Sequence, residues 1–597
     1  MYQPLSIRGG TNPTQATTFM GAKGVNGRDL PQLLDPSMAL IIDNYLVTAD
    51  GQLAKRKGQV EEFSVAGTDP ITMIIEWDAD TWIFAYAFKV AAYTLSTDTV
   101  TDIKTDFTVN DTFSGQRYGG YFFVSNGNNG IVRISRTIDY GTQTANFTVG
   151  ARITGATSGA TATILEDSDG GATGTLTIGN ITGTFQSGEI ITDNGSPTGS
   201  ATTTSVVEFV DTVISAAPKA KVLKVIGARL FAGNIEQDEA SVAYSGIDDG
   251  SNPPFDNWTV AAAADDPGLA SYRNAGTVNA IDTVGEFVVV FSEKGKWAFY
   301  INTVDSAGTL TKIDVFQMTR IDFGGSRATI STNQGLFYAN EAGLWQLVSV
   351  GQQNIKFSDQ EALTSVLLGD KFFDNVDLSN AAIEYDAKAR NILLSIAKNS
   401  DTNNLILVYN IDTKAFSTIS AWNINRFMNI DQVIYGGSAT STKVDKLFIG
   451  TTDNGASIGT NFLQELQLGN LETKQMLLGC YIQGFLSASS DITVRFDIYD
   501  ITGKPIKDKL RFSWTAQRSE NGFDGYGTAN WGISSWGGDV DFANLIESFD
   551  GCRPFIRNFQ RVRVHITSGD KLQHVINWVS LEAKVKSKIR RRKMTAL

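Results

Sequence analysis

The chain has 597 residues, of which 42% are hydrophobic and 19% are charged, and its formal net charge is −13. This length exceeds what one hydrophobic core usually organises, so we expect two to four globular domains. The acidic balance argues against a protein that grips nucleic acid, because that binding depends on Lys and Arg side chains that neutralise phosphates.

Residues 33–58 form the most specific stretch of an N-terminal segment that we assign to residues 1–70 and expect to join the next domain. A turn begins at Pro36, and an apolar segment follows from Met38 to Leu46. Asp50 and Gly51 then predict a tight turn before a basic strand that ends at Gly58.

Residues 71–146 and 208–460 repeat one scheme, in which apolar strands alternate with polar turns rich in Gly, Asn or Asp. A small antiparallel sheet cannot bury both faces alone, so the series predicts a β-propeller of about six or seven blades. Trp297 and Trp345 follow equivalent hairpin turns. We therefore expect both on strands of adjacent blades and largely buried.

Residues 147–207 interrupt the series. They are rich in Gly, Thr, Ala and Ser, and a motif that begins at Gly150 is nearly duplicated from Gly188. A low-complexity linker is one interpretation, but isoleucines recur through the stretch too regularly for disorder. We expect a small β module inserted into a propeller loop, where added residues are tolerated best.

Residues 461–597 alternate apolar and polar positions in long strands, which favours a β-sandwich-like domain. The fold class predicted for the whole chain is therefore all-β. The C-terminal tail carries seven cations with no acid among them, which are Lys584, Lys586, Lys588, Arg590, Arg591, Arg592 and Lys593. We predict that these cations contact an acidic protein partner, and the alternative is a solvated chain end.

The chain offers few residues for catalysis or metal binding. Its only histidines are His565 and His574, and its only cysteines are Cys480 and Cys552. These cannot form a His/Cys metal set, and we expect two buried thiols, with one Cys480–Cys552 bridge left open. Acidic pairs lie in polar turns, where Asp caps the backbone, namely Asp78/Asp80, Asp248/Asp249 and Asp265/Asp266. We predict no enzyme activity and no cofactor.

The first residues hold no apolar run long enough for a secretory signal, and the longest apolar stretches are shorter than a membrane span. We therefore expect a protein that is made in a cytoplasm and does not cross a membrane.

The motif in residues 33–58 resembles the N-terminal signature of the tail hub or nozzle proteins of short-tailed phages, also called tail tubular protein B. The matching residues are Asp35, Pro36, Ala39, Asn44, Gly51, Leu53, Arg56 and Gly58. The resemblance implies a structural virion protein that forms a homohexamer below an adaptor ring, carries fibres or tailspikes, and lets genomic DNA pass without sequence-specific binding. The acidic balance fits a wall along which DNA slides.

In such a particle, the basic tail is expected to dock on an adjacent tail subunit or on the adaptor ring. An alternative reading is a carbohydrate-binding or carbohydrate-cleaving propeller, in which Tyr526, Trp531 and Trp536 stack on sugars. A host-binding module without a conduit is a third possibility.

Overall fold

In the computed structural model of the protein, strands make up almost all of the regular structure. The helical elements of the described residues are short, such as α1 (Leu363–Leu367). The all-β fold class predicted from the sequence is confirmed. The structure describes residues 14–19, 23–29, 34–35, 37–108, 112–248, 253–258, 267–285, 287–301, 313–317, 324–350, 356–359, 362–369, 372–467, 473–487, 490–500, 504–515, 545–552, 556–559 and 561–588.

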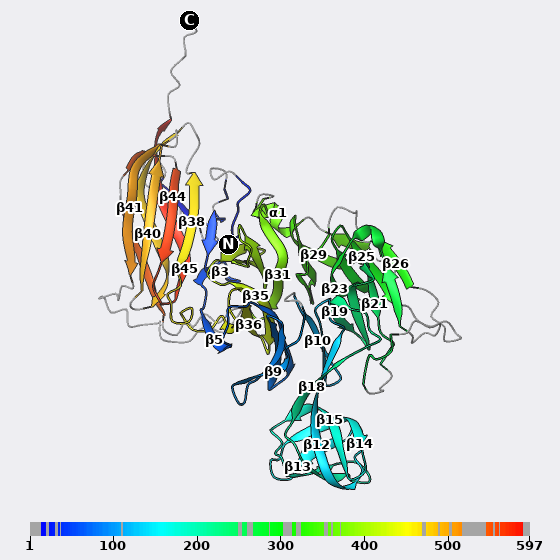
Figure 1. Cartoon of the computed structure of the whole chain (residues 1–597). Coiled ribbons are helices and arrows are strands. Elements are labelled where there is room, and N and C mark those ends of the chain that lie inside the picture. The colour runs from blue at the N-terminus through cyan, green and yellow to red at the C-terminus, as the bar shows by residue number, and fades with distance from the viewer. Residues whose placement is uncertain are drawn as a thin grey trace.

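Seven groups of four antiparallel strands form the largest part of the molecule (Figure 1). Blade 1 consists of β6 (Ile71–Asp78), β7 (Thr81–Tyr86), β8 (Lys89–Thr94) and β9 (Thr99–Lys104), and blade 2 consists of β10 (Ser114–Tyr118), β11 (Tyr121–Ser125), β12 (Val132–Ala145) and β18 (Glu208–Val213). Blade 3 consists of β19 (Ala220–Ile226), β20 (Arg229–Ile235), β21 (Asp238–Tyr244) and β22 (Gly268–Ser271). Blade 4 consists of β23 (Val278–Val284), β24 (Phe287–Ser292), β25 (Lys296–Ile301) and β26 (Ile313–Gln317). Blade 5 consists of β27 (Thr329–Thr332), β28 (Gly335–Asn340), β29 (Gly343–Val350) and β30 (Lys356–Asp359). Blade 6 consists of β31 (Val376–Asp386), β32 (Asn391–Lys398), β33 (Leu405–Asn410) and β34 (Phe416–Ile419). Blade 7 consists of β35 (Ile424–Ile430), β36 (Val433–Ser438), β37 (Lys443–Leu447) and β5 (Gln59–Ser64).

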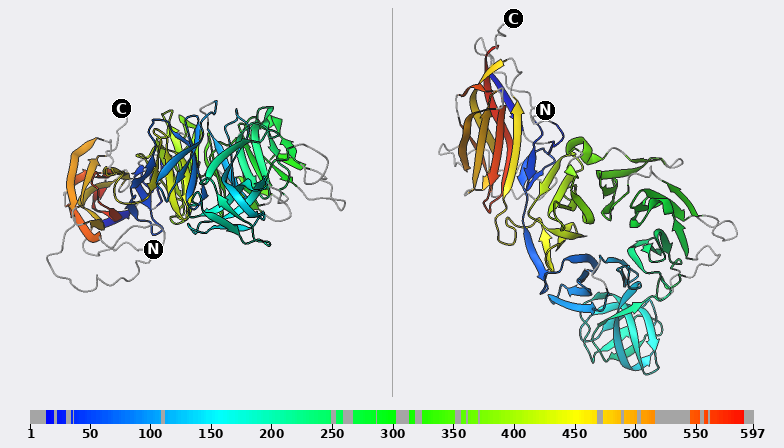
Figure 2. Two further views of the ribbon diagram at one scale, coloured as in Figure 1. Left: turned by 60° about the horizontal axis from the view of Figure 1, so that its bottom comes forward. Right: turned by 45° about the horizontal axis from the view of Figure 1, so that its top comes forward.

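The seven blades close into a propeller, as the right-hand view of Figure 2 shows. The first strands of the blades contact one another in chain order, and the last of them, β35, also contacts β6. A strand from the N-terminal part completes the ring, because β5 pairs with β37 as the fourth strand of blade 7. Phe63 of β5 stacks on Tyr93 of blade 1 with ring centroids 4.1 Å apart, so the closing strand also joins the first and last blades.

The second strands of the blades are apolar on both faces because a neighbouring blade covers each face. All six residues of β7 are buried, and so are the last five of β24. Continuous apolar runs of this length are therefore propeller strands rather than helices. Trp297 on β25 of blade 4 is fully buried, whereas Trp345 on β29 of blade 5 is partly buried.

The inserted module is a closed barrel that grows directly out of blade 2. Its strands pair in the order β12, β15 (Thr173–Thr182), β14 (Thr161–Asp169), β13 (Arg152–Gly155), β16 (Ile190–Asp193) and β17 (Ser200–Thr203), and β17 pairs back onto β12. The two nearly duplicated motifs form β13–β14 and β16–β17. The module begins near Arg136, where β12 starts to pair with β15, and not at residue 147 as we expected from composition.

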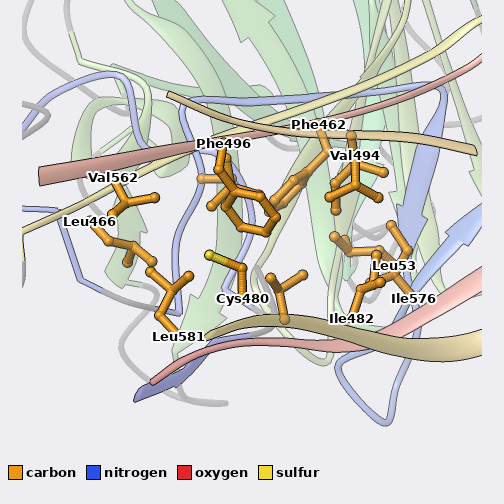
Figure 3. Close-up of a cluster of buried hydrophobic side chains, with 14 of the residues drawn as sticks. Leu53, Phe462, Leu466, Cys480, Ile482, Val494, Phe496, Val562, Ile576 and Leu581 are labelled. Carbon is orange, nitrogen blue, oxygen red and sulfur yellow. The ribbon is translucent and has the colours of Figure 1, made fainter. Parts of the chain in front are cut away.

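The C-terminal domain is a sandwich of two sheets with a shared apolar core (Figure 3). One sheet contains β39 (Thr473–Ser487), β45 (His574–Lys588), β42 (Leu545–Cys552) and β43 (Ile556–Phe559), and the other contains β38 (Thr460–Gln467), β44 (Arg561–Ser568), β40 (Asp491–Tyr499) and β41 (Pro505–Thr515). The N-terminal segment adds strands to both sheets. These strands are β1 (Thr14–Phe19), β3 (Tyr45–Val47) and β4 (Leu53–Lys55) in the first sheet and β2 (Ile41–Asp43) in the second.

The N-terminal segment is therefore not a separate unit, because it contributes to both large domains. β2 pairs with β38 of the sandwich on one side and with β34 of blade 6 on the other, so one sheet runs continuously from the propeller into the sandwich. This sheet places the described part of residues 33–58 at the joint between the two domains.

Candidate functional site: the joint between propeller and sandwich

A buried arginine lies at the centre of the joint. The side chain of Arg56 is inaccessible to solvent. Its Nη1 and Nη2 donate to the two carboxylate oxygens of Asp453, at 2.8 and 2.6 Å, and its Nε donates to Oδ1 of Asn44 at 2.7 Å. This fork-to-fork pairing is the strongest geometry available to an arginine and a carboxylate.

Two further residues hold this pair in place. The ring of Trp422 lies 4.3 Å from the guanidinium carbon of Arg56, and its indole nitrogen donates to Oδ1 of Asp453 at 3.0 Å. Asn44 adopts a left-handed φ of 58° and donates from Nδ2 to the carbonyl of Gly459 at 2.7 Å. The cluster thus joins the N-terminal segment to chain regions on both sides of blade 7.

Gly58 lets the backbone of the N-terminal segment approach the chain beyond blade 7. A Cβ atom at this position would lie 1.8 Å from the carbonyl oxygen of Thr452, which is far inside van der Waals contact. The amide of Gly58 donates to Gly450, and that of Gln59 donates to Thr452. A glycine is therefore required at this point of the joint.

A second buried cation ties the same segment to the sandwich. Nζ of Lys55 donates to the backbone carbonyl of Asp570 at 2.7 Å, to its Oδ1 at 3.0 Å and to the carbonyl of Leu572 at 3.0 Å. Burial lowers the pKa of Lys55, although the Asp570 carboxylate acts in the opposite direction. Consecutive residues, Lys55 and Arg56, therefore anchor opposite sides of the joint.

A buried histidine lies next to this lysine. The hydroxyl of Tyr45 is 2.8 Å from Nε2 of His574, and Thr460 donates to the same hydroxyl at 3.1 Å. Because Thr460 supplies a hydrogen to the Tyr45 oxygen, the Tyr45 hydrogen is available to the ring nitrogen. Burial, reinforced by the positive charge of Lys55, lowers the pKa of His574 to about 3.

The other signature residues shape the backbone or fill the core. Hydrogen bonds from the hydroxyl and amide of Ser37 hold the pKa of Asp35 down at about 2. Ala39 is fully buried, Gly51 makes its turn with a φ of 75°, and Leu53 enters the sandwich core. Each described signature residue therefore shapes a turn, fills the core or makes a contact at the joint.

The seven cations of the C-terminal tail are only partly within the described chain. Lys584, Lys586 and Lys588 lie on β45, where Lys584 pairs in register with Thr14 of β1 and Lys588 with Thr473 of β39. The remaining four, Arg590, Arg591, Arg592 and Lys593, lie outside the described residues. The first three cations therefore belong to the last described part of β45.

Other residues weighed from the sequence have structural surroundings. Asp78 pairs with the buried Arg136 at 2.6 Å, and Asp80 accepts hydrogen bonds from the amide and hydroxyl of Ser96. Cys480 is buried and lies opposite Cys552 in the β39–β42 register. Outside the described residues lie Pro36, Asp249, Asp265, Asp266, Tyr526, Trp531 and Trp536.

Two cavities lie near these features. One of about 210 Å³ lies beside the joint, between the N-terminal segment, with Leu46 and Ala54, and blade 7, with Val433 and Leu447. Another of about 310 Å³ lies at the base of the barrel module and is lined by residues that include Arg136. Within the described part of the chain, no three His, Cys, Asp or Glu side chains gather as metal ligands would.

Sequence reasoning missed the partners that make the joint. Asp453, Trp422 and Asp570 lie hundreds of residues from the cations that they contact, and each has an ordinary polar or turn-like local context. The usable signal is the pair of cations Lys55 and Arg56 directly after the apolar residues Leu53 and Ala54, because cations that become buried require partners.

Comparison with known proteins identifies no family. No family model matches the chain, and no curated protein matches it. Among solved structures, one similar chain is the extracellular domain of a hybrid two-component system from B. thetaiotaomicron, with 10% identity, a TM-score of 0.35 and coverage of 73% of this chain. The chain spans 45% of that protein.

A second similar chain belongs to a structure of the Mitotic Checkpoint Complex, with 9% identity and a TM-score of 0.32. The match covers 65% of this chain and 96% of that one. Neither likeness carries an argument about function.

Among the helices of the described residues, none is long and apolar enough to cross a membrane.

Proposed function

We propose that the chain is a structural subunit of the tail nozzle of a short-tailed phage. The observation that carries the proposal is the place of the signature segment. Its residues Asn44, Arg56 and Gly58 lie at the joint between propeller and sandwich, bonded to Asp453 and to the backbone beyond blade 7. A motif that sets the angle between two domains suits a protein whose task is to hold a fixed shape in an assembly.

In this proposal the DNA passes between subunits and not through the propeller of one chain. The inner strands of neighbouring blades contact one another around the propeller axis, and Arg426 of β35 bonds to carbonyls of Thr72 and Asn380 on the adjacent inner strands. A ring of several propellers provides the wider channel. The net charge of −13 supports a wall that does not retain phosphates.

Negative-stain electron microscopy of the purified protein and of particles that contain it tests the proposal. We expect a six-fold ring with a central opening of about 20 Å or more, the scale set by duplex DNA. Binding of free duplex DNA is expected to be weak at physiological salt. A single chain that acts alone on a polysaccharide, or a complex without a central opening, would contradict the proposal.

The basic tail provides a second test. Because β45 extends to Lys588, truncation after this residue removes Arg590 to Lys593 without shortening the sheet. We expect the truncated protein to assemble less well than the full chain at low salt, with a deficit that shrinks as salt is raised, because exposed ion pairs are individually weak and are screened. The fraction of protein in rings is measured across a salt series.

The matched control lacks only the last four residues, 594–597, and therefore keeps every cation of the tail. It is expected to assemble like the full chain. Equal assembly of the two truncated proteins at every salt concentration would show that the tail is a solvated end.

A further inference from the structure

The outer face of the second sandwich sheet has an unusual composition for this acidic protein. Along β44, Val562, Val564 and Ile566 point into the core, while Arg561, Arg563 and His565 alternate with them and lie on the outer face. The adjacent strand β40 continues the pattern, because Arg495 pairs in register with His565, Asp497 with Arg563, and Tyr499 with Arg561. Arg511 of β41 extends it, opposite Arg495. We call the set Arg495, Arg511, Arg561 and Arg563 the arginine face.

The acidic side chains that pair with the arginine face are less exposed to solvent than the arginines are. Only 1% of the side chain of Glu465 on β38 is exposed, whereas that of Arg563 is 36% exposed. Glu465 accepts from Nη1 of Arg561 at 3.0 Å and from Nε and Nη2 of Arg563 at 3.1 and 2.7 Å. A partner that approaches the sheet therefore meets guanidinium groups first, while the compensating carboxylate is covered.

A second acid acts in the same way one row along the sheet. Asp497 accepts from Nη2 of Arg495 at 2.7 Å, and only 13% of its side chain is exposed. The same Nη2 lies 3.0 Å from Nε2 of His565, whose pKa is lowered by burial and by Arg495. The ring of Tyr499 lies within 5.7 Å of the guanidinium carbon of Arg561. These contacts hold Arg495, Arg561 and Arg563 in place before any partner arrives.

We propose that the arginine face docks on an acidic surface of a second copy of this chain. A guanidinium has five N–H groups in a rigid fork that matches a carboxylate, and those not engaged by Glu465 or Asp497 remain for a partner. Side chains that are already ordered lose less entropy on binding. Because the whole chain has a net charge of −13, a neighbouring copy carries an excess of carboxylates with which these guanidinium groups can pair.

A second copy fits this surface better than duplex DNA does. Phosphate binding depends on cations without local acids, whereas here two carboxylates lie within hydrogen-bonding distance of three of the four arginines. Arginine and tyrosine, which this face combines, are enriched at protein interfaces. The inference rests on the proposed function in so far as that function requires copies of the chain to assemble.

Sedimentation velocity of the full-length protein at about 50 mM and about 500 mM NaCl tests the inference, because salt screens exposed charges. We expect self-association at the lower salt that weakens at the higher. The triple variant Glu465→Gln, Arg561→Gln and Arg563→Gln removes two guanidinium charges together with the buried carboxylate that they bond, so no buried charge loses its partner. Its dissociation constant is expected to rise by about tenfold or more.

Two further variants make the result specific. Arg511 is exposed, so Arg511→Glu leaves the fold intact and is expected to weaken self-association in the same direction. The matched control is Lys219→Gln, Arg273→Gln and Glu236→Gln, which removes two exposed cations and one exposed acid from blade 3 and the turn before blade 4. This control is expected to associate like the wild type.

The outcomes separate this inference from the proposed function. A six-fold ring that forms equally well in all variants, or a wild-type protein that stays a single chain in all conditions, overturns the docking surface. Duplex DNA binding that only the arginine variants lose, with self-association unchanged, also overturns it. A complex of another symmetry that depends on the arginines retains the docking surface and contradicts the nozzle.

Discussion

The variant Asp453→Ala is expected to lose about 3–5 kcal/mol of unfolding free energy, because it leaves the guanidinium of Arg56 buried without its carboxylate. Trp422 also loses the acceptor of its indole N–H. The cost arises at the joint, so the sandwich is expected to detach from the propeller before the blades unfold. Urea unfolding and limited proteolysis, with sites of cleavage mapped by mass spectrometry, measure the two effects.

The double variant Arg56→Met and Asp453→Leu separates a missing partner from a missing interaction. Because it replaces a buried ion pair with apolar side chains, we expect it to be more stable than Asp453→Ala alone. Asp412→Ala is the matched control, since Asp412 pairs with Arg390 at 2.6 Å near the surface and such pairs contribute at most about 1 kcal/mol. Equal losses in Asp453→Ala and Asp412→Ala would show that the joint does not depend on this pair.

The contrast between these two ion pairs also explains which features the sequence could predict. A blade is formed mainly by strands that follow one another in the chain. A hairpin turn, such as that between β28 and β29, therefore lies directly beside the apolar runs that it joins. The joint is not local, since Arg56 and Asp453 are separated by most of the propeller. No local pattern around Asp453 distinguishes it from an ordinary turn residue.

The boundary of the inserted module shows a related limit. Composition changes near Phe147, where aromatic residues become rare, and this change set the expected boundary. The hydrogen-bond pattern changes earlier, because β12 is one strand that pairs with β11 up to Ile134 and with β15 from Arg136. A strand that serves two sheets keeps its alternation throughout, so the sequence contains no signal at the point of exchange.

The stability of the sandwich is expected to fall as the pH is lowered from about 6.5 towards about 3, with His574 as a main cause. Burial lowers the pKa of His574 to about 3 in the folded protein, while an unfolded chain has the ordinary histidine value of about 6.5. Between these values the unfolded state binds a proton that the folded state does not. Each unit of pH in this window therefore costs up to about 1.4 kcal/mol of unfolding free energy.

His574→Gln tests this assignment, because glutamine keeps a polar side chain near the Tyr45 hydroxyl and does not titrate. We expect it to be less stable than the wild type at pH about 7.5, and the difference to shrink as the pH falls through the window in which only the wild type's unfolded state gains a proton. Urea midpoints across the pH series measure the difference. His565→Gln, on the partly exposed outer face, is the control and is expected to change the slope less.

Asp570 also makes the unfolding free energy fall as the pH is lowered, but at lower pH than His574 does. Burial opposes its ionisation, yet hydrogen bonding by Ser490 and the charge of Lys55 keep its pKa below the ordinary value. Its contribution is present above the unfolded pKa of about 3.9 and is lost as the pH falls through the folded value, in the wild type and the glutamine variant alike. The difference between the two proteins therefore isolates His574. Parallel stability curves from neutral pH to pH about 4 would mean that His574 takes up its proton in the folded joint.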